Sequence, residues 1–139
     1  MEFSRKTDYA LRAMVELANG HEGPVPAAEL ARRTLVPYAF LTKILMELSA
    51  HRFVAITRGR KGGVRMAVDP TQTTALQIIE TMSGPLSFSR CVIEPDSCPR
   101  QTFCSVHDMW TSAREGLRKS LSIDLQTLAR SPKRKREGG

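Results

Sequence analysis

The chain has 139 residues, of which 41% are hydrophobic and 25% are charged, with a formal net charge of +7 and a pI of about 9.8. This is the balance of one globular domain with an accessory element. No apolar run approaches the roughly 18 residues of a membrane span, and no secretory signal opens the chain, so we expect a cytoplasmic protein without a membrane partner. Part of the positive excess lies in the terminal run 133–137, so charge alone favours an anionic partner only weakly.

Three helices are predicted in the N-terminal part of the chain. Ser4 can cap the first of them, and Asn19-Gly20 ends it. The segment 26–33 opens with a proline, which suits the start of a short helix, and Pro37 starts a longer helix after a brief turn. The longer helix has an apolar stripe at helical spacing, made of Leu41, Ile44, Leu45 and Leu48.

A short helix, a brief turn and a longer helix with a polar, basic outer face form the pattern of a helix-turn-helix. In the longer helix, Tyr38, Thr42 and Lys43 face away from the apolar stripe, near the start of the helix. Side chains at that place contact bases or phosphates in helix-turn-helix proteins. We therefore expect these three residues to contact double-stranded DNA; the alternative is an ordinary solvated surface.

Two β-prone runs, 53–57 and 64–68, flank a loop at 58–63 that carries three glycines and three cations. Glycines allow close backbone approach, and cations suit a phosphate backbone or a minor groove. This combination is typical of the wing of a winged helix, and the alternative is a solvated surface hairpin. We expect Arg58 or Arg60 to enter the minor groove. The basic residues expected to contact DNA here are Arg58, Arg60, Lys61 and Arg65.

A fourth helix is predicted over 74–82 and a long amphipathic helix over 105–121. The apolar stripe of the long helix is larger than a small winged-helix domain needs, so a second copy of the protein is the expected partner. The predicted fold class is mostly α with a small β-hairpin wing: a winged helix-turn-helix domain plus a long C-terminal dimerisation helix. The predicted divisions are a DNA-binding domain at 1–84, a cysteine loop at 85–104, a dimerisation helix and terminal segment at 105–130, and a disordered basic tail at 131–139.

Three cysteines, Cys91, Cys98 and Cys104, lie within fourteen residues, and His107 follows three residues later. Prolines interrupt this segment, so the thiols are expected on a loop, where soft ligands suit an iron–sulfur cluster or a zinc ion. Cys104 and His107 are about one helical turn apart and can face one ion. Residue chemistry alone leaves a cluster and a structural zinc site open, with buried structural thiols as the third alternative.

The segments 7–13, 37–48 and 58–63 and the three-cysteine loop occur in the order found in a known family. Together they resemble the IscR/NsrR-type bacterial winged-helix transcriptional regulators, the Rrf-two superfamily. The resemblance extends from residue 1 to about residue 130 and implies a homodimer that binds pseudo-palindromic promoter DNA. It also implies a cofactor, one iron–sulfur cluster per subunit of the 2Fe–2S or the 4Fe–4S type.

The resemblance further implies that Cys91, Cys98 and Cys104 are the cluster thiolates. His107 matches the fourth ligand of the IscR-like pattern. Asp8 stands where NsrR-like proteins donate a carboxylate from the partner subunit, and both residues are present. We favour His107 because Trp110, which follows it, also fits the IscR-like pattern.

The expected function is therefore a transcriptional regulator whose promoter binding is controlled by an iron–sulfur cluster that senses redox state, nitric oxide or iron and cluster supply. A winged-helix regulator with a structural zinc or a thiol-based switch in the cysteine loop is the alternative. A cluster-bearing electron-transfer protein is a further, weaker alternative. An enzyme is not expected, because the sequence has no nucleophile–base pairing, phosphate loop or paired carboxylates.

Overall fold

The computed structural model describes residues 3–86 and 103–131, so Cys91, Cys98 and the basic tail from residue 132 lie outside the described residues. The described part is mostly helical with a two-stranded antiparallel hairpin, which confirms the predicted fold class. Its elements are α1 (Arg5–Ala18), α2 (Ala27–Thr34), α3 (Tyr38–Ala50), β1 (Val54–Thr57), β2 (Gly63–Met66), α4 (Ala75–Ser83), α6 (Ser105–Leu121) and α7 (Leu125–Arg130).

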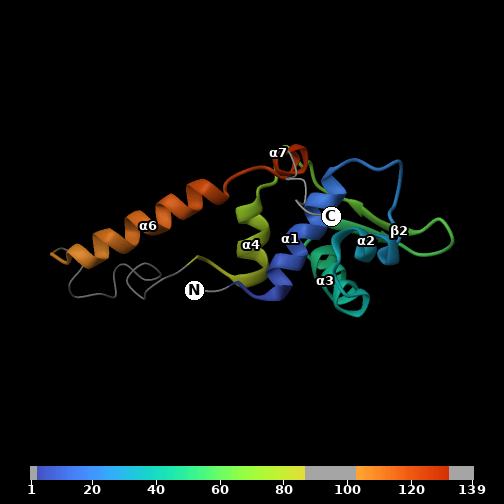
Figure 1. Ribbon diagram of the computed structural model, residues 1–139, viewed down its shortest axis with the longest axis horizontal. Helices are drawn as coiled ribbons and strands as arrows, with labels where there is room; N and C mark the ends of the chain where they lie inside the picture. The colour runs from blue at the N-terminus through green and yellow to red at the C-terminus, as the bar shows by residue number, and fades with distance from the viewer. Residues whose placement is uncertain (1–2, 87–102, 132–139) are drawn as a thin grey trace, which may run out of the picture.

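Helix α1 lies at the centre of the winged-helix body, and α2, α3, α4 and α7 pack against it (Figure 1). It begins as predicted, because the Ser4 hydroxyl accepts a hydrogen bond from the Thr7 N–H at 3.3 Å and satisfies a first-turn donor. Its small buried side chains let the neighbouring helices approach closely, which removes apolar surface from water. The buried residues of α1 are Thr7, Ala10, Ala13, Met14, Leu17 and Ala18.

The wing is anchored to the body by a third extended segment. Val25 and Val64 exchange two backbone hydrogen bonds of 2.8 Å each, so residue 25 extends the β1–β2 pair on its β2 side. Gly63, with φ of 157°, makes this possible, because a Cβ there would lie 2.5 Å from the Val25 carbonyl oxygen. The root of the wing is therefore fixed while its loop projects away from the body (Figure 1).

Helix α7 completes the core of the winged-helix body. Leu125 at its first position is fully buried with the side chains of α1, and its N–H donates to the Thr73 carbonyl at 2.9 Å. Ala75 at the start of α4 donates to the Ile123 carbonyl at the same distance. The chain thus returns to the body after α6, and the segment around residue 125 packs with α1 and α4 rather than with α6.

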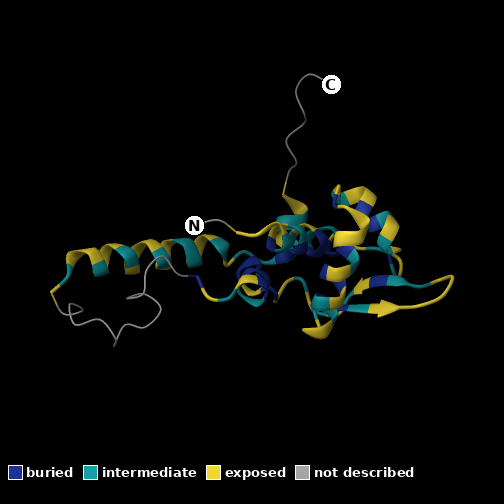
Figure 2. Ribbon diagram, turned by 90° about the horizontal axis from the view of Figure 1, so that it is seen from below, coloured by how far each residue is buried: buried dark blue, intermediate teal, exposed yellow. Residues whose placement is uncertain are grey.

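Helix α6 projects from the body as an arm (Figures 1 and 2). None of its residues is buried, and Leu117 and Leu121 pack on a small apolar cluster made of Leu76, Ile79 and Leu86. Arg114, nearer the middle of the helix, donates to the Leu86 carbonyl at 3.0 Å. Arg118 and Glu80 form an ion pair at the same junction. No helix among the described residues is long and apolar enough to cross a bilayer.

Candidate nucleic-acid interface and cysteine-loop site

The turn between α2 and α3 sets the position of the candidate recognition helix. Leu35 lies in the left-handed region with φ of 58° and ψ of 33°, and its N–H donates to the Ala31 carbonyl. Val36 then inserts into the core, and Pro37, whose φ is fixed by its ring, precedes the first turn of α3. The predicted apolar stripe of α3 is confirmed, since all four of its members are buried: Leu41, Ile44, Leu45 and Leu48.

The predicted DNA-contacting residues of α3 share its outer side. Tyr38 is 57% exposed and Lys43 is exposed, while Thr42 is half-buried. The Thr42 hydroxyl donates to the Ala39 carbonyl at 3.0 Å, so its proton is already committed to the helix backbone. Met46, one turn beyond Thr42, is 68% exposed. The helix therefore presents a continuous open face to solvent.

Two contacts that sequence reasoning did not predict hold α3 against α1. The Lys6 ammonium donates to the Glu47 carboxylate at 3.2 Å, and the Tyr9 and Phe40 rings meet edge to face with centroids 5.5 Å apart. Lys6 and Glu47 are 41 residues apart in the chain, so no local pattern pairs them. Contacts with α1 therefore hold α3 on the side opposite its open face.

The wing presents unpaired positive charge. Arg58, Arg60, Lys61 and Arg65 are all exposed, and within the part of the chain that the structure describes none of them pairs with a carboxylate. Gly62 keeps the loop tight, since a Cβ there would lie 2.2 Å from the Thr57 carbonyl oxygen. Free cations on a projecting loop can contact phosphates at little cost, because no ion pair has to be broken.

The cations of α2 differ from those of the wing. Arg32 and Arg33 both donate to Glu29, and Arg33 also lies 3.5 Å from the Glu16 carboxylate. The hydrogen bond from Arg32, and then that from Arg33, lowers the pKa of the Glu29 carboxyl to about 2. Glu29 therefore stays ionised and holds both guanidinium groups on α2, so these arginines are less available to a DNA backbone than Lys43 and the wing.

The described part of the cysteine-loop site lies at the start of the arm. Cys104 is the N-cap residue of α6 and is partly exposed, and His107 lies in the first turn of the same helix. The Nδ1 atom of His107 is buried and has no hydrogen-bond partner among the residues that the structure describes. A buried imidazole nitrogen without a partner is costly unless something binds it, and it is a good ligand for a metal.

Of the other predicted ligands, only Asp8 lies among the residues that the structure describes. Cys91 and Cys98 lie outside the described residues, and among the residues described no three His, Cys, Asp or Glu side chains gather as a metal site. Asp8 lies on α1, and its carboxylate accepts a 2.8 Å hydrogen bond from Arg12. Cys104 instead lies at the start of the projecting helix α6.

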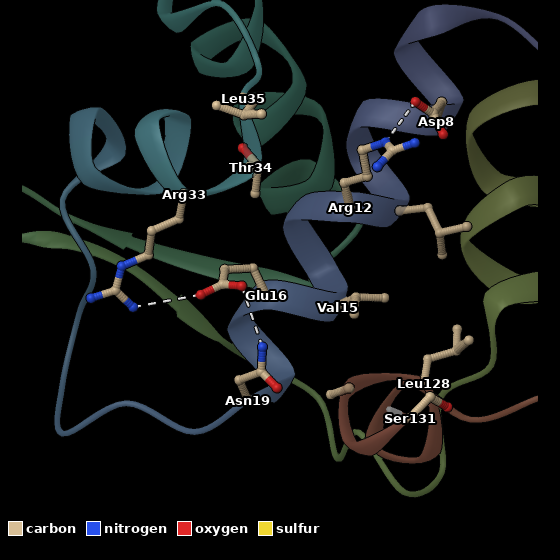
Figure 3. Close-up of a pocket in the computed structure, with 12 residues that line it drawn as sticks. Asp8, Arg12, Val15, Glu16, Asn19, Arg33, Thr34, Leu35, Leu128 and Ser131 are labelled. Carbon is tan, nitrogen blue, oxygen red and sulfur yellow. Dashed lines mark hydrogen bonds and ion pairs between the residues drawn. The ribbon is translucent and has the colours of Figure 1, made fainter. Parts of the chain in front are cut away.

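A cleft of about 580 Å³ lies between α1, the α2–α3 turn and α7 (Figure 3). Its charged lining groups pair with one another: Arg12 with Asp8, and Arg33 with Glu16. Leu11, Val15 and Leu128 supply much of the remaining lining. With its charges already compensated, this cleft is a weaker candidate for an ionic ligand than either α3 or the arm.

Comparison with known proteins identifies the fold. The profile of the Rrf2 family, described as an iron-dependent transcriptional regulator, matches residues 3–131. The chain belongs to the Rrf2 family. Among solved structures, the Rrf2 chain is similar to CymR (YrzC), the global cysteine regulator of B. subtilis, with a TM-score of 0.76 and 27% identity over 93% of this chain and 96% of that one.

Sequence relatives agree with the family assignment. An HTH-type transcriptional regulator of Mycobacterium tuberculosis strain H37Rv is 33% identical over 122 residues, which is 87% of this chain and 76% of the relative. The IscR regulator of Xenorhabdus nematophila is 26% identical over 133 residues, covering 94% of this chain and 80% of its own. This Rrf2 protein is accordingly a DNA-binding transcriptional regulator and not an enzyme, as the sequence predicted.

Proposed function

We propose that this Rrf2 regulator is a homodimer whose promoter binding is controlled by an iron–sulfur cluster. Cys91, Cys98 and Cys104 are the proposed thiolate ligands, and His107 is the proposed fourth. The observation that carries the proposal is the buried, unpartnered Nδ1 atom of His107 in the helical turn that follows Cys104. The description of the family as iron-dependent supports it.

The donor set fits the proposed group. Thiolates are the usual ligands of iron in such clusters, and an imidazole replaces a thiolate in some of them. A bound cluster supplies a centre that gains or loses electrons and that oxygen or nitric oxide can alter. A fourth ligand other than cysteine favours lability, which suits a sensor. Asp8 remains the alternative fourth ligand, from the partner subunit, but its carboxylate would first have to leave Arg12.

The arm supports the proposed dimer. Phe103 is 76% exposed, Met109 is 54% exposed and Val106 is 52% exposed, and all three lie in or beside the first turns of α6. A projecting helix without buried residues gains little from propensity alone and is stabilised when its apolar stripe is covered. A second copy of the arm offers the same apolar stripe, so a two-fold pairing would cover both.

The proposed regulation follows from the two ends of α6. Its first turn carries Cys104 and His107, while its last turns pack on α4 through Leu117 and Leu121. A rigid helix transmits a change at one end to the other, so a shift of the first turn changes how two winged-helix bodies are held. The spacing of two α3 helices and two wings along the duplex then changes with it.

DNA contact is assigned to the open face of α3 and to the wing. Tyr38, Thr42 and Lys43 would lie in the major groove, and Lys61 and Arg65 would contact phosphates. Arg58 or Arg60 would enter the minor groove. The exposure of these residues and the absence of ion pairs at the wing, within the described ranges, support this assignment.

Metal analysis on one anaerobically purified sample tests the proposal, with visible absorbance, iron, acid-labile sulfide and zinc all determined. Brown protein with matching iron and sulfide is expected. Colourless protein with one zinc per chain would contradict the cluster and favour the second candidate, a regulator with a structural zinc or thiol switch, since three cysteines and a histidine are also a regular zinc set. Failure to bind any DNA selectively would contradict the promoter-binding part of the proposal.

A further inference from the structure

The composition of α3 restricts how it can read bases. Its sequence, YAFLTKILMELSA, contains no Arg, Asn, Gln or Asp. Arginine pairs bidentately with guanine, asparagine and glutamine pair with adenine, and acidic side chains accept from cytosine. Most of the side chains that recognise bases by paired hydrogen bonds are therefore missing from this helix.

Two of the remaining polar side chains of α3 are occupied by other groups of the protein. Glu47 is the helix's carboxylate, and it is bound by Lys6 of α1. Thr42 uses its hydroxyl proton on the Ala39 carbonyl. Lys43 keeps a free ammonium group, exposed and without an ion pair among the described residues.

Apart from Lys43 and Tyr38, which is 57% exposed, the open face is made of methyl and thioether groups. Ala39 is exposed, Thr42 is half-buried and carries a methyl group beside its hydroxyl, and Met46 is 68% exposed one turn further on. In the major groove, thymine is the base that offers an apolar group, its 5-methyl. Burying a methyl against a methyl on both partners removes apolar surface from water without needing a hydrogen bond.

We propose that α3 recognises its DNA site through thymine methyl groups, contacted by Ala39, Thr42 and Met46, with Lys43 reading a guanine beside them. This rests on the proposed function, because it requires α3 to enter the major groove. It predicts operator half-sites in which thymines face α3 and in which the sequence preference comes from shape and methyl contacts more than from paired hydrogen bonds.

Deoxyuridine substitution tests the proposal, because deoxyuridine differs from thymidine only by the missing 5-methyl group. The 139-residue chain, purified anaerobically, first selects duplexes from a random-sequence pool, and its half-site is footprinted. Each thymine in the half-site is then replaced singly, and affinity is measured by fluorescence anisotropy. A loss of about four-fold is expected for each contacted methyl, and none for thymines replaced in the flanking DNA.

Substitutions in α3 test whether the lost affinity comes from contacts with this helix. Thr42→Ser removes one methyl group and keeps the hydroxyl that donates to the Ala39 carbonyl. In this variant, replacing one particular thymidine by deoxyuridine should no longer lower the affinity. Thr81→Ser is the matched control, because the Thr81 hydroxyl also donates to a backbone carbonyl of its own helix, that of Gln77 on α4. Met46→Ala should remove the penalty at a different thymine. All three variants keep the helix backbone bonds, so their folding can be checked by circular dichroism.

The outcomes separate this inference from the proposed function. Equal affinity for every deoxyuridine duplex, in a protein that still selects a sequence, would overturn methyl recognition and leave DNA binding in place. A penalty that persists unchanged in Thr42→Ser and in Met46→Ala would also overturn it. If the protein selects no sequence from the random pool, both the proposed function and thymine recognition by α3 are contradicted.

Discussion

The fourth ligand is a question about single side chains. His107 has a buried ring nitrogen without a partner, whereas the Asp8 carboxylate already has one in Arg12. A buried nitrogen without a partner gains more from binding a metal than an exposed carboxylate does, so the two residues are expected to respond differently to substitution.

We expect His107→Ala to lose the cluster absorbance or to shift its visible bands, and Asp8→Asn to leave the spectrum of the anaerobic protein unchanged. His51→Ala is the control, because His51 is an exposed histidine at the end of α3. Loss of the bands in Asp8→Asn with an unchanged His107→Ala spectrum would reverse the assignment.

Leu35 is the residue at which local backbone preference and the fold disagree. A leucine in the left-handed region costs about 1–2 kcal/mol, and this one recovers little by burial since it is 76% exposed. The turn into α3 imposes the conformation, and glycine adopts it freely.

Leu35→Gly is therefore expected to raise the free energy of unfolding by about 0.5–1 kcal/mol, after the greater freedom of glycine in the unfolded chain is subtracted. Urea denaturation followed by circular dichroism measures it. Met46→Gly, at an exposed position with ordinary helical backbone, should instead lower it by about 1 kcal/mol. A destabilised Leu35→Gly protein would show that the side chain, and not the backbone, determines this turn.

At the scale of the elements, local signals predicted most of the structure. Ser4, Pro37 and Thr74 mark helix starts as caps or preceding residues, and the 105–121 helix has the bounds that its periodicity predicted. What sequence could not give depends on contacts between distant segments. The pairing of Val25 with Val64 and the packing of Leu125 into the α1 core carry no local pattern.

In the candidate site, too, local sequence patterns predicted some features, while others depend on contacts between distant residues. The outer face of α3 and the basic wing follow from periodicity and from the glycine-rich loop, and the structure exposes them as expected. The Lys6–Glu47 pair, which links α1 to α3, joins residues that no spacing rule connects. The cluster ligands stay predictions, since Cys91 and Cys98 lie outside the described residues.

Removing one wing cation tests the wing as a DNA-binding element. Each phosphate contact releases about one counterion, so Lys61→Ala is expected to reduce the slope of log affinity against log salt by about 1. Arg32→Ala is the control, because that guanidinium is already bound to Glu29. Salt titrations of duplex binding measure the slope for both variants. An equal reduction of the slope in the two variants would contradict a particular role of the wing in contacting phosphates.

The whole molecule is an arm attached to a winged-helix body, with the wing loop and the tip of α6 at opposite ends (Figure 1). Placing a charge on the apolar stripe of the arm should separate two copies. Met109→Asp is expected to shift the protein from dimer to monomer in sedimentation velocity while the helical content stays unchanged, because Met109 is 54% exposed and belongs to neither core cluster of the described residues.

Ser112→Asp is the matched control, since it places the same charge at an exposed polar position of the same helix. A monomeric parent protein, or a Met109→Asp variant that remains dimeric, would contradict pairing through the arm. If the dimer dissociates equally in both variants, the added charge, and not the loss of the apolar contact of Met109, would explain the dissociation.

In the proposed function the cluster controls DNA binding, and one titration measures this coupling. The affinity of the anaerobic protein for its selected duplex is measured before and after the iron is removed by chelation, with iron and sulfide determined on each sample. Coupling between two sites commonly changes affinity about 5- to 150-fold, and we predict a change of at least about ten-fold. Equal affinity in the iron-loaded and iron-free samples would contradict the account.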